Sequence, residues 1–142
     1  MEIVMMTGKE FKIQNALGLI SDSDKLGLAG NPKTPKGILT ELSTDKDWNV
    51  RFYVACNSST PRSILKILST DEESIVRYWV ADNSNTSKSI LKKLSTDENP
   101  GTRCRVANNP NTSKGILKIL STDSILGVRY EVAKNPNTLK KL

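Results

Sequence analysis

The sequence contains no histidine among its 142 residues. Histidine is the commonest general base and a frequent ligand of zinc and iron, and it activates the nucleophile in Ser-His and Cys-His active sites. Its absence excludes those sites. The chain also has no glycine-rich phosphate loop, and no carboxylate pair stands at a non-repeating position. We therefore predict a non-enzymatic protein with no catalytic residue, no cofactor and no metal.

Cysteine and long apolar runs are also scarce. Cys56 and Cys104 are the only cysteines and do not form a C-x-x-C motif, so neither a disulfide framework nor a zinc knuckle is indicated. No window approaches the ~20 apolar residues of a membrane span. Glu2 stands where a signal peptide would carry positive charge. We expect a cytoplasmic protein that forms one domain over residues 1–142 and does not enter a membrane.

The motif LSTD occurs four times, at residues 42–45, 68–71, 94–97 and 120–123, always at an interval of 26 residues. Alanine, asparagine, threonine, arginine and valine columns recur at the same interval. Four complete units cover residues 31–134 without an insertion. Residues 1–30 predict an N-terminal cap with a degenerate unit, and residues 135–142 begin a truncated fifth unit. An active site needs a set of residues that differs from the rest of the chain, whereas packing can use the same residues in every unit. Four identical copies therefore indicate a structural scaffold.

Each unit predicts two short helices. Asn109 and Pro110 indicate a turn, and Thr112 suits the N-cap of a helix that starts at the proline or serine position after it. Ile116, Leu117 and the leucine at i+4 form one apolar stripe, which predicts a first helix of about eight to ten residues. The hydroxyl pair and carboxylate of LSTD would end this helix, and the carboxylate or the threonine beside it would cap the second helix.

The second helix directs an arginine column toward the packed interior. Its members are Arg51, Arg77, Arg103 and Arg129. A buried guanidinium must be paired, so we predict bonds to the LSTD aspartates, within a unit or between adjacent units. An anion site is the alternative. The asparagine column predicts a ladder of turns that satisfies backbone groups. Its members are Asn31, Asn57, Asn83, Asn109 and Asn135.

The pattern NPNTSKGILKILSTD…VRYEVAKNP resembles the leucine-rich repeat variant family, and the Asp and Val-Arg positions resemble HEAT-like repeats. The resemblance implies an all-α, right-handed α-solenoid of short helix pairs, in which an α-helix alternates with a shorter helix that can be 3₁₀. It also implies that the outer face of the second helices lines a concave side. Some family members bind an iron–sulfur cluster through N-terminal cysteines, which this N-terminus lacks.

Basic residues occupy seven of the eight positions in two columns on the outer arc of the first helix, with Thr40 at the eighth, and the chain has a net charge of +6. These columns can be an ordinary solvated face or a stripe that binds nucleic acid or another polyanion. The candidate polyanion-binding residues are Lys36, Arg62, Lys66, Lys88, Lys92, Lys114 and Lys118.

Aromatic residues gather on the outer arc of the second helix, where the units differ from one another. The rings can pack against neighbouring units or form a groove for an extended ligand, since aromatic and arginine side chains are common at binding hot spots. Our leading prediction is a groove for an unknown protein or peptide, with a rim extended by Trp48 and Ile75. The predicted contacts are Phe52, Tyr53, Tyr78, Trp79, Arg105 and Tyr130.

The C-terminal end of the stack presents an apolar face that a polar cap would normally cover. The stub of residues 139–142, a second copy of the chain or a further segment could cover it. Self-association through this end is therefore one prediction, and a strictly monomeric protein in sedimentation would count against it.

Overall fold

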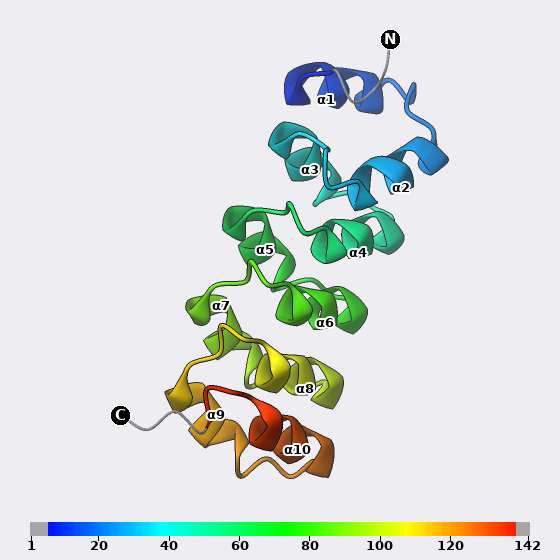
Figure 1. Ribbon diagram of the computed structural model, residues 1–142. Coiled ribbons are helices and arrows are strands. Elements are labelled where there is room, and N and C mark those ends of the chain that lie inside the picture. The colour runs from blue at the N-terminus through cyan, green and yellow to red at the C-terminus, as the bar shows by residue number, and fades with distance from the viewer. Residues whose placement is uncertain (1–5, 139–142) are drawn as a thin grey trace.

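Residues 6–138, which the computed structural model describes, form ten helices and no strand (Figure 1). The predicted all-α class is confirmed. The helices are α1 (Gly8–Ala16), α2 (Asp22–Gly30), α3 (Lys36–Leu42), α4 (Trp48–Cys56), α5 (Arg62–Leu68), α6 (Ser74–Asp82), α7 (Lys88–Leu94), α8 (Pro100–Asn108), α9 (Lys114–Leu120) and α10 (Leu126–Lys134).

The helices lie in two columns (Figure 1). The even-numbered helices pack side by side in order from α2 to α10. Each odd-numbered helix from α3 to α9 packs against the two even-numbered helices that flank it in sequence, and α1 packs on α3. The chain thus runs from one end of the stack to the other, and each segment contacts mainly its sequence neighbours.

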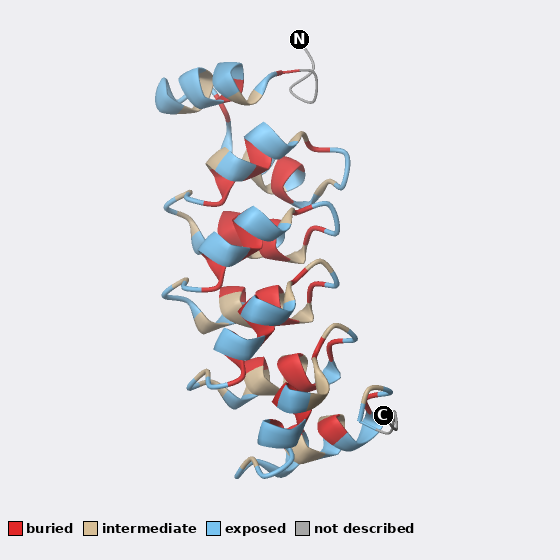
Figure 2. Cartoon of the chain, turned by 90° about the vertical axis from the view of Figure 1, so that its left-hand side faces the viewer, coloured by how far each residue is buried: buried red, intermediate tan, exposed pale blue. Residues whose placement is uncertain are grey.

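Buried residues occur in every helix pair along the stack (Figure 2), and the apolar ones form one hydrophobic core. The predicted stripe of the first helix is buried: Ile38, Leu39 and Leu42 of α3 are fully inaccessible to solvent. Val54 and Ala55 of α4 are buried in the same way. Each buried leucine or isoleucine contributes about 1.5–3 kcal/mol of transfer free energy, so the stripe stabilises the stack.

The threonine column does not cap the first helices, and this prediction was wrong. The Thr60 hydroxyl donates to the carbonyl oxygen of Val54 in the last turn of α4, at 2.6 Å. The last carbonyls of a helix lack partners within it, so a buried threonine six residues later satisfies one of them. The N-cap position lies one residue further on, where Ser87 of α7 accepts from the Ile90 N–H at 3.4 Å and Ser113 does the same for α9. Prolines occupy this position in α3 and α5 and form no side-chain cap.

Both helices of a pair are α-helical, with seven residues in the first and nine in the second. The first is shorter than predicted, because the Ser43 hydroxyl donates to the Thr40 carbonyl at 2.7 Å where α3 ends. The predicted capping of α4 by Thr44 or Asp45 was wrong. Asp47 caps α4, accepting from the Asn49 N–H at 2.9 Å.

Each of three arginines in the column pairs with the aspartate of the next LSTD motif. This confirms the predicted ladder and shows that its side-chain bonds run between adjacent units. The Arg51 Nε and Nη2 donate to the two carboxylate oxygens of Asp71 at 2.7 and 3.1 Å. Its Nη1 donates to the Asp45 carbonyl at 2.8 Å, so one guanidinium joins two successive turns. The same bonds recur at Arg77–Asp97 and Arg103–Asp123. These three guanidinium groups are therefore structural and do not form an anion site.

The asparagine column forms the predicted ladder. The Asn83 Nδ2 donates to the carbonyl oxygens of Ala55 and Asn57 at 2.8 and 3.0 Å, and its Oδ1 accepts from the Asn85 N–H at 2.9 Å. Equivalent pairs of bonds are made by Asn57, Asn109 and Asn135. Each side chain therefore satisfies backbone groups that the helix ends leave without partners.

The N-terminal end departs from the repeating pattern. Within the predicted cap, α1 ends at Ala16, and Gly18 follows with a φ of 69°. Lys25 of α2 takes the place of the arginine column, and its Nζ lies 3.2 Å from the Asp45 carboxylate.

At the C-terminal end, Asn135 and Thr138 keep the bonds of the earlier units. Residues 139–142 of the predicted fifth unit lie outside the described residues, and so does the proposed cover that they would form. Self-association through this end stays a prediction.

Candidate functional site

Five of the six predicted contact residues lie on adjacent even-numbered helices and form one surface. We call it the aromatic surface; it consists of Phe52 and Tyr53 on α4, Tyr78 and Trp79 on α6, and Arg105 on α8. Because α4, α6 and α8 pack side by side, a residue of one helix meets a residue 27 positions later on the next helix, as Phe52 meets Trp79 and Tyr78 meets Arg105. The position of each ring along its helix therefore decides which rings meet.

The aromatic rings contact one another edge to face. The Phe52 and Trp79 rings join α4 to α6, with their centroids 5.8 Å apart and an interplanar angle of 87°. Phe52 also meets Tyr53 at 5.0 Å, and Tyr78 meets Trp79 at 5.4 Å. Such pairs add about 0.5–1.5 kcal/mol beyond area burial. The rings are therefore held in one arrangement before any ligand arrives.

Arg105 ends the aromatic surface with a positive charge. Its guanidinium lies over the Tyr78 ring, 5.0 Å from the centroid, and its Nη1 is 3.4 Å from an Asp82 carboxylate oxygen. Gly101 leaves room for this ring, since a Cβ there would lie 3.4 Å from the Tyr78 Cδ2. The Arg105 Nε is buried and has no hydrogen-bond partner among residues 6–138. The Nε–H is therefore an unsatisfied buried donor, whereas Nη1 is engaged by Asp82.

The rings differ in exposure. Some pack against the core, as one interpretation of the sequence pattern predicts, and others are exposed, as the groove interpretation requires. Phe52 and Trp79 are half-buried and pack against the hydrophobic core, as the packing alternative requires. Tyr53 is 42% exposed and Trp48, which meets Phe52 edge to face at 6.4 Å, is 43% exposed. Ile75 is also exposed, as the predicted rim requires. The inner rings fix the arrangement, and the outer ones remain available to a partner.

Tyr130 is not part of this surface. Its ring is 60% exposed and lies under the Lys134 ammonium, 5.1 Å from the centroid. Within the described residues, no ring contact joins it to another aromatic residue, because the contacts between helices link residues 27 positions apart and Arg103 stands 27 positions before Tyr130. The predicted six-residue surface is therefore interrupted at α8.

Sequence reasoning missed a small hollow beside Trp79. It has a volume of ≈ 200 Å³ and its lining includes Cys56, Trp79 and Asp82. Burial, reinforced by the Asp82 charge, raises the pKa of the Cys56 thiol to about 12. The thiol is therefore protonated at neutral pH and is a poor nucleophile. Cys56 and Asp82 occupy equivalent positions in successive units, and the residue at this position differs in every unit. The position reads Cys56, Asp82, Asn108 and Lys134, and this variation is the sequence signal that could have pointed to the hollow.

The predicted polyanion-binding residues lie on the other column of helices. Lys36 belongs to α3, and the remaining six belong to α5, α7 and α9. Six of the seven side chains are exposed and Lys114 is half-buried. Hollows separate α7 from its neighbours, and basic side chains line them. This surface is thus distinct from the aromatic surface, which lies on the even-numbered helices.

Within residues 6–138, no group of three or more cysteine, aspartate or glutamate side chains is placed to hold a metal ion. The helices of that range are also too short or too polar to cross a membrane. No protein-family model, curated protein or solved structure matches the chain. The resemblance to leucine-rich repeat variants and HEAT-like repeats therefore rests on the motifs alone.

Proposed function

We propose that the chain is a right-handed α-solenoid of 26-residue units that works as a non-enzymatic scaffold and binds a protein or peptide through the aromatic surface. The bounds of the helices support the architecture, because α3, α5, α7 and α9 begin at Lys36, Arg62, Lys88 and Lys114. The repeated arginine and asparagine ladders give each unit the same joint to the next.

The observation that carries the function is the edge-to-face contact of Phe52 with Trp79 across two helices, flanked by the exposed rings of Tyr53 and Trp48. A preformed aromatic cluster offers contact area with little loss of conformational entropy on binding. Arg105 adds a charged anchor at one end. A partner segment with apolar side chains beside a carboxylate would match both features.

The aromatic surface can be tested by selecting peptides from a displayed random library against the intact chain. Tyr53→Ala should weaken the selected peptides by about thirtyfold, which corresponds to a hot-spot loss of about 2 kcal/mol. Ile67→Ala is the matched control, because Ile67 is an exposed apolar residue of α5, on the other column. Peptides that bind folded Tyr53→Ala as tightly as the parent chain, or that are lost only in Ile67→Ala, would contradict the proposal.

A further inference from the structure

Seven basic side chains lie on three odd-numbered helices without any acidic residue among them. There are two on α5, three on α7 and two on α9, and these helices contain no aspartate or glutamate. None of the seven takes part in an ion pair with any residue between 6 and 138. We call the face formed by α5, α7 and α9 the odd-helix basic surface.

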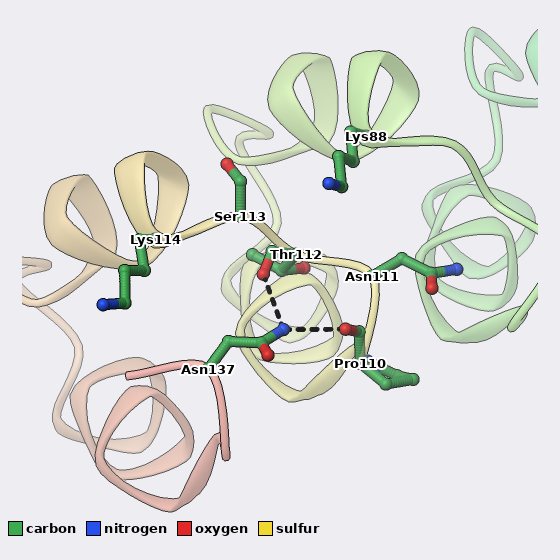
Figure 3. A pocket seen from close by; sticks show the side chains of 7 residues that line it. All are labelled: Lys88, Pro110, Asn111, Thr112, Ser113, Lys114 and Asn137. Carbon is green, nitrogen blue, oxygen red and sulfur yellow. Dashed lines mark hydrogen bonds between the residues drawn. The ribbon is translucent and has the colours of Figure 1, made fainter. Parts of the chain in front are cut away.

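This surface is hollowed between its helices. Arg62 and Lys88 line a hollow of ≈ 380 Å³ between α5 and α7. Lys88 and Lys114 line the next one, of ≈ 440 Å³, between α7 and α9 (Figure 3). Lys88 therefore borders both hollows, which makes them one continuous basic strip across three helices.

Polar groups complete the lining of the hollow between α7 and α9. The Ser113 side chain lies between the two lysines, and Asn111 lies on the other side of the hollow (Figure 3). Asn137 is already engaged, since its Nδ2 donates to the carbonyl oxygens of Pro110 and Thr112 at 2.8 and 3.1 Å. These two hydrogen bonds hold one wall of the hollow in place. Serine, asparagine and lysine side chains are typical donors to phosphate oxygens.

The acidic residues of the units lie elsewhere. Most follow the C-terminal ends of the odd-numbered helices, where Asp71, Asp97 and Asp123 are bound by the arginine column. The acidic residues of α6 and α10, Asp82 and Glu131, lie near Arg105 and Lys134 of the even-numbered helices. Arg62, Lys88 and Lys114 stand at the opposite, N-terminal ends. The positive charge of the strip is therefore not neutralised by neighbouring carboxylates, and an anionic polymer would be attracted to it.

We propose that the odd-helix basic surface binds the phosphate backbone of a nucleic acid without reading its base sequence. Lysine acts as a point charge toward phosphate, and phosphate contacts carry no sequence information. Helices α5, α7 and α9 contain no aromatic residue, so the strip offers no platform on which bases could stack. This function goes beyond the peptide site, because it uses the other column of helices and leaves the aromatic surface free.

A nucleic acid fits the surface better than an anionic membrane does. The basic side chains border hollows between separate helices, and a chain of phosphates can follow such a strip. A membrane-binding face would instead need a continuous apolar stripe beside the charges. The exposed apolar residues on these helices are Ile67 and Ile119, which lie on α5 and α9 with Lys93 at the equivalent position between them.

The experiment measures binding of a labelled, mixed-sequence DNA duplex and of a single-stranded RNA by fluorescence anisotropy. We expect binding at low salt, with an affinity that falls linearly with salt on logarithmic axes between about 50 and 200 mM. Lys88→Glu combined with Lys114→Glu should weaken binding at least about tenfold and flatten the salt dependence. Duplexes of different sequence should bind equally.

The matched control combines Lys12→Glu with Lys46→Glu, which changes the net charge by the same amount at two exposed lysines of other segments. Circular dichroism would verify that both double variants are folded. Equal weakening by the control, no binding at low salt, or binding only to vesicles of anionic lipid would overturn the proposal. Loss of nucleic-acid binding in Tyr53→Ala would also overturn it, because the aromatic surface would then be the site.

Discussion

Arg51 and Asp71 form a bidentate pair across two successive units, with nitrogen–oxygen distances of 2.7 and 3.1 Å. Their side chains are only 11% and 6% exposed. The Asp71 carboxylate also accepts from the Glu73 N–H at 3.0 Å, so it orders the turn before α6. A buried pair of this kind costs most when one partner is removed, because the other charge is then left unpaired.

We expect Asp71→Ala to destabilise the protein by about 3 kcal/mol and to lower the melting temperature by about 10 °C. Thermal unfolding followed by circular dichroism measures this effect. Glu72→Ala is the control: Glu72 is also near Arg51, at 3.9 Å, but it is 85% exposed and should contribute little. Equal effects of the two substitutions would refute the structural role of Asp71. Peptide binding at the aromatic surface should be unchanged in both variants.

Acid should weaken the ladder at Asp123. The hydrogen bonds from Arg103 hold the pKa of this carboxyl below its ordinary value, and burial opposes this shift. A carboxyl whose pKa is lower in the folded state stabilises the fold above its unfolded pKa, about 3.9, and this contribution is lost as the pH falls through the folded pKa. We expect the free energy of unfolding to fall below about pH 4, and to fall less steeply in Asp123→Asn. Identical pH profiles for the two proteins would contradict this account.

The arginine ladder shows what helical periodicity can and cannot predict. The periodicity places Arg51 toward the interior, and physical chemistry then requires a carboxylate partner. It does not say whether the partner is Asp45 or Asp71, because the offset between stacked helices is a tertiary property. The structure uses both, the first through its backbone carbonyl and the second through its side chain.

The threonine column was predicted wrongly, and Tyr130 lies apart from the other rings, for different physical reasons. Thr60 lies between two helices, and its hydroxyl could satisfy the end of one or the start of the other. The structure selects the carbonyl of Val54, which packing buries. For Tyr130, the column places the ring on the correct face, but a ring contact also needs a ring at the position that packing brings beside it, which for the Phe52–Trp79 pair lies 27 residues along the chain. Arg103 stands 27 residues before Tyr130 and is bound to Asp123, and the offset that brings these positions together is a tertiary property.

Gly8 should tolerate no side chain, because it lies against Gly37 where α1 packs on α3. A Cβ on Gly8 would come within 2.7 Å of the Gly37 Cα, which is closer than atoms can approach. We expect Gly8→Ala to cost about 1–3 kcal/mol and to increase hydrogen exchange in α1, whose Phe11 is fully buried. Gly115→Ala is the control, since its Cβ would meet only the Ser113 hydroxyl at 4.0 Å. Unchanged stability and exchange in Gly8→Ala would show that α1 can shift without cost.

Thr102 is the one polar residue in a buried column that otherwise reads Val50, Val76 and Val128. Its side chain is fully buried, and the hydroxyl has no hydrogen-bond partner among the described residues. A buried hydroxyl without a partner costs free energy that a methyl group of the same shape does not. We expect Thr102→Val to stabilise the protein by about 1 kcal/mol in urea unfolding. The reverse substitution, Val76→Thr, should destabilise it by a similar amount, because it places the same hydroxyl in the equivalent position of α6. A destabilised Thr102→Val would mean that the hydroxyl has a partner in solution, such as a buried water.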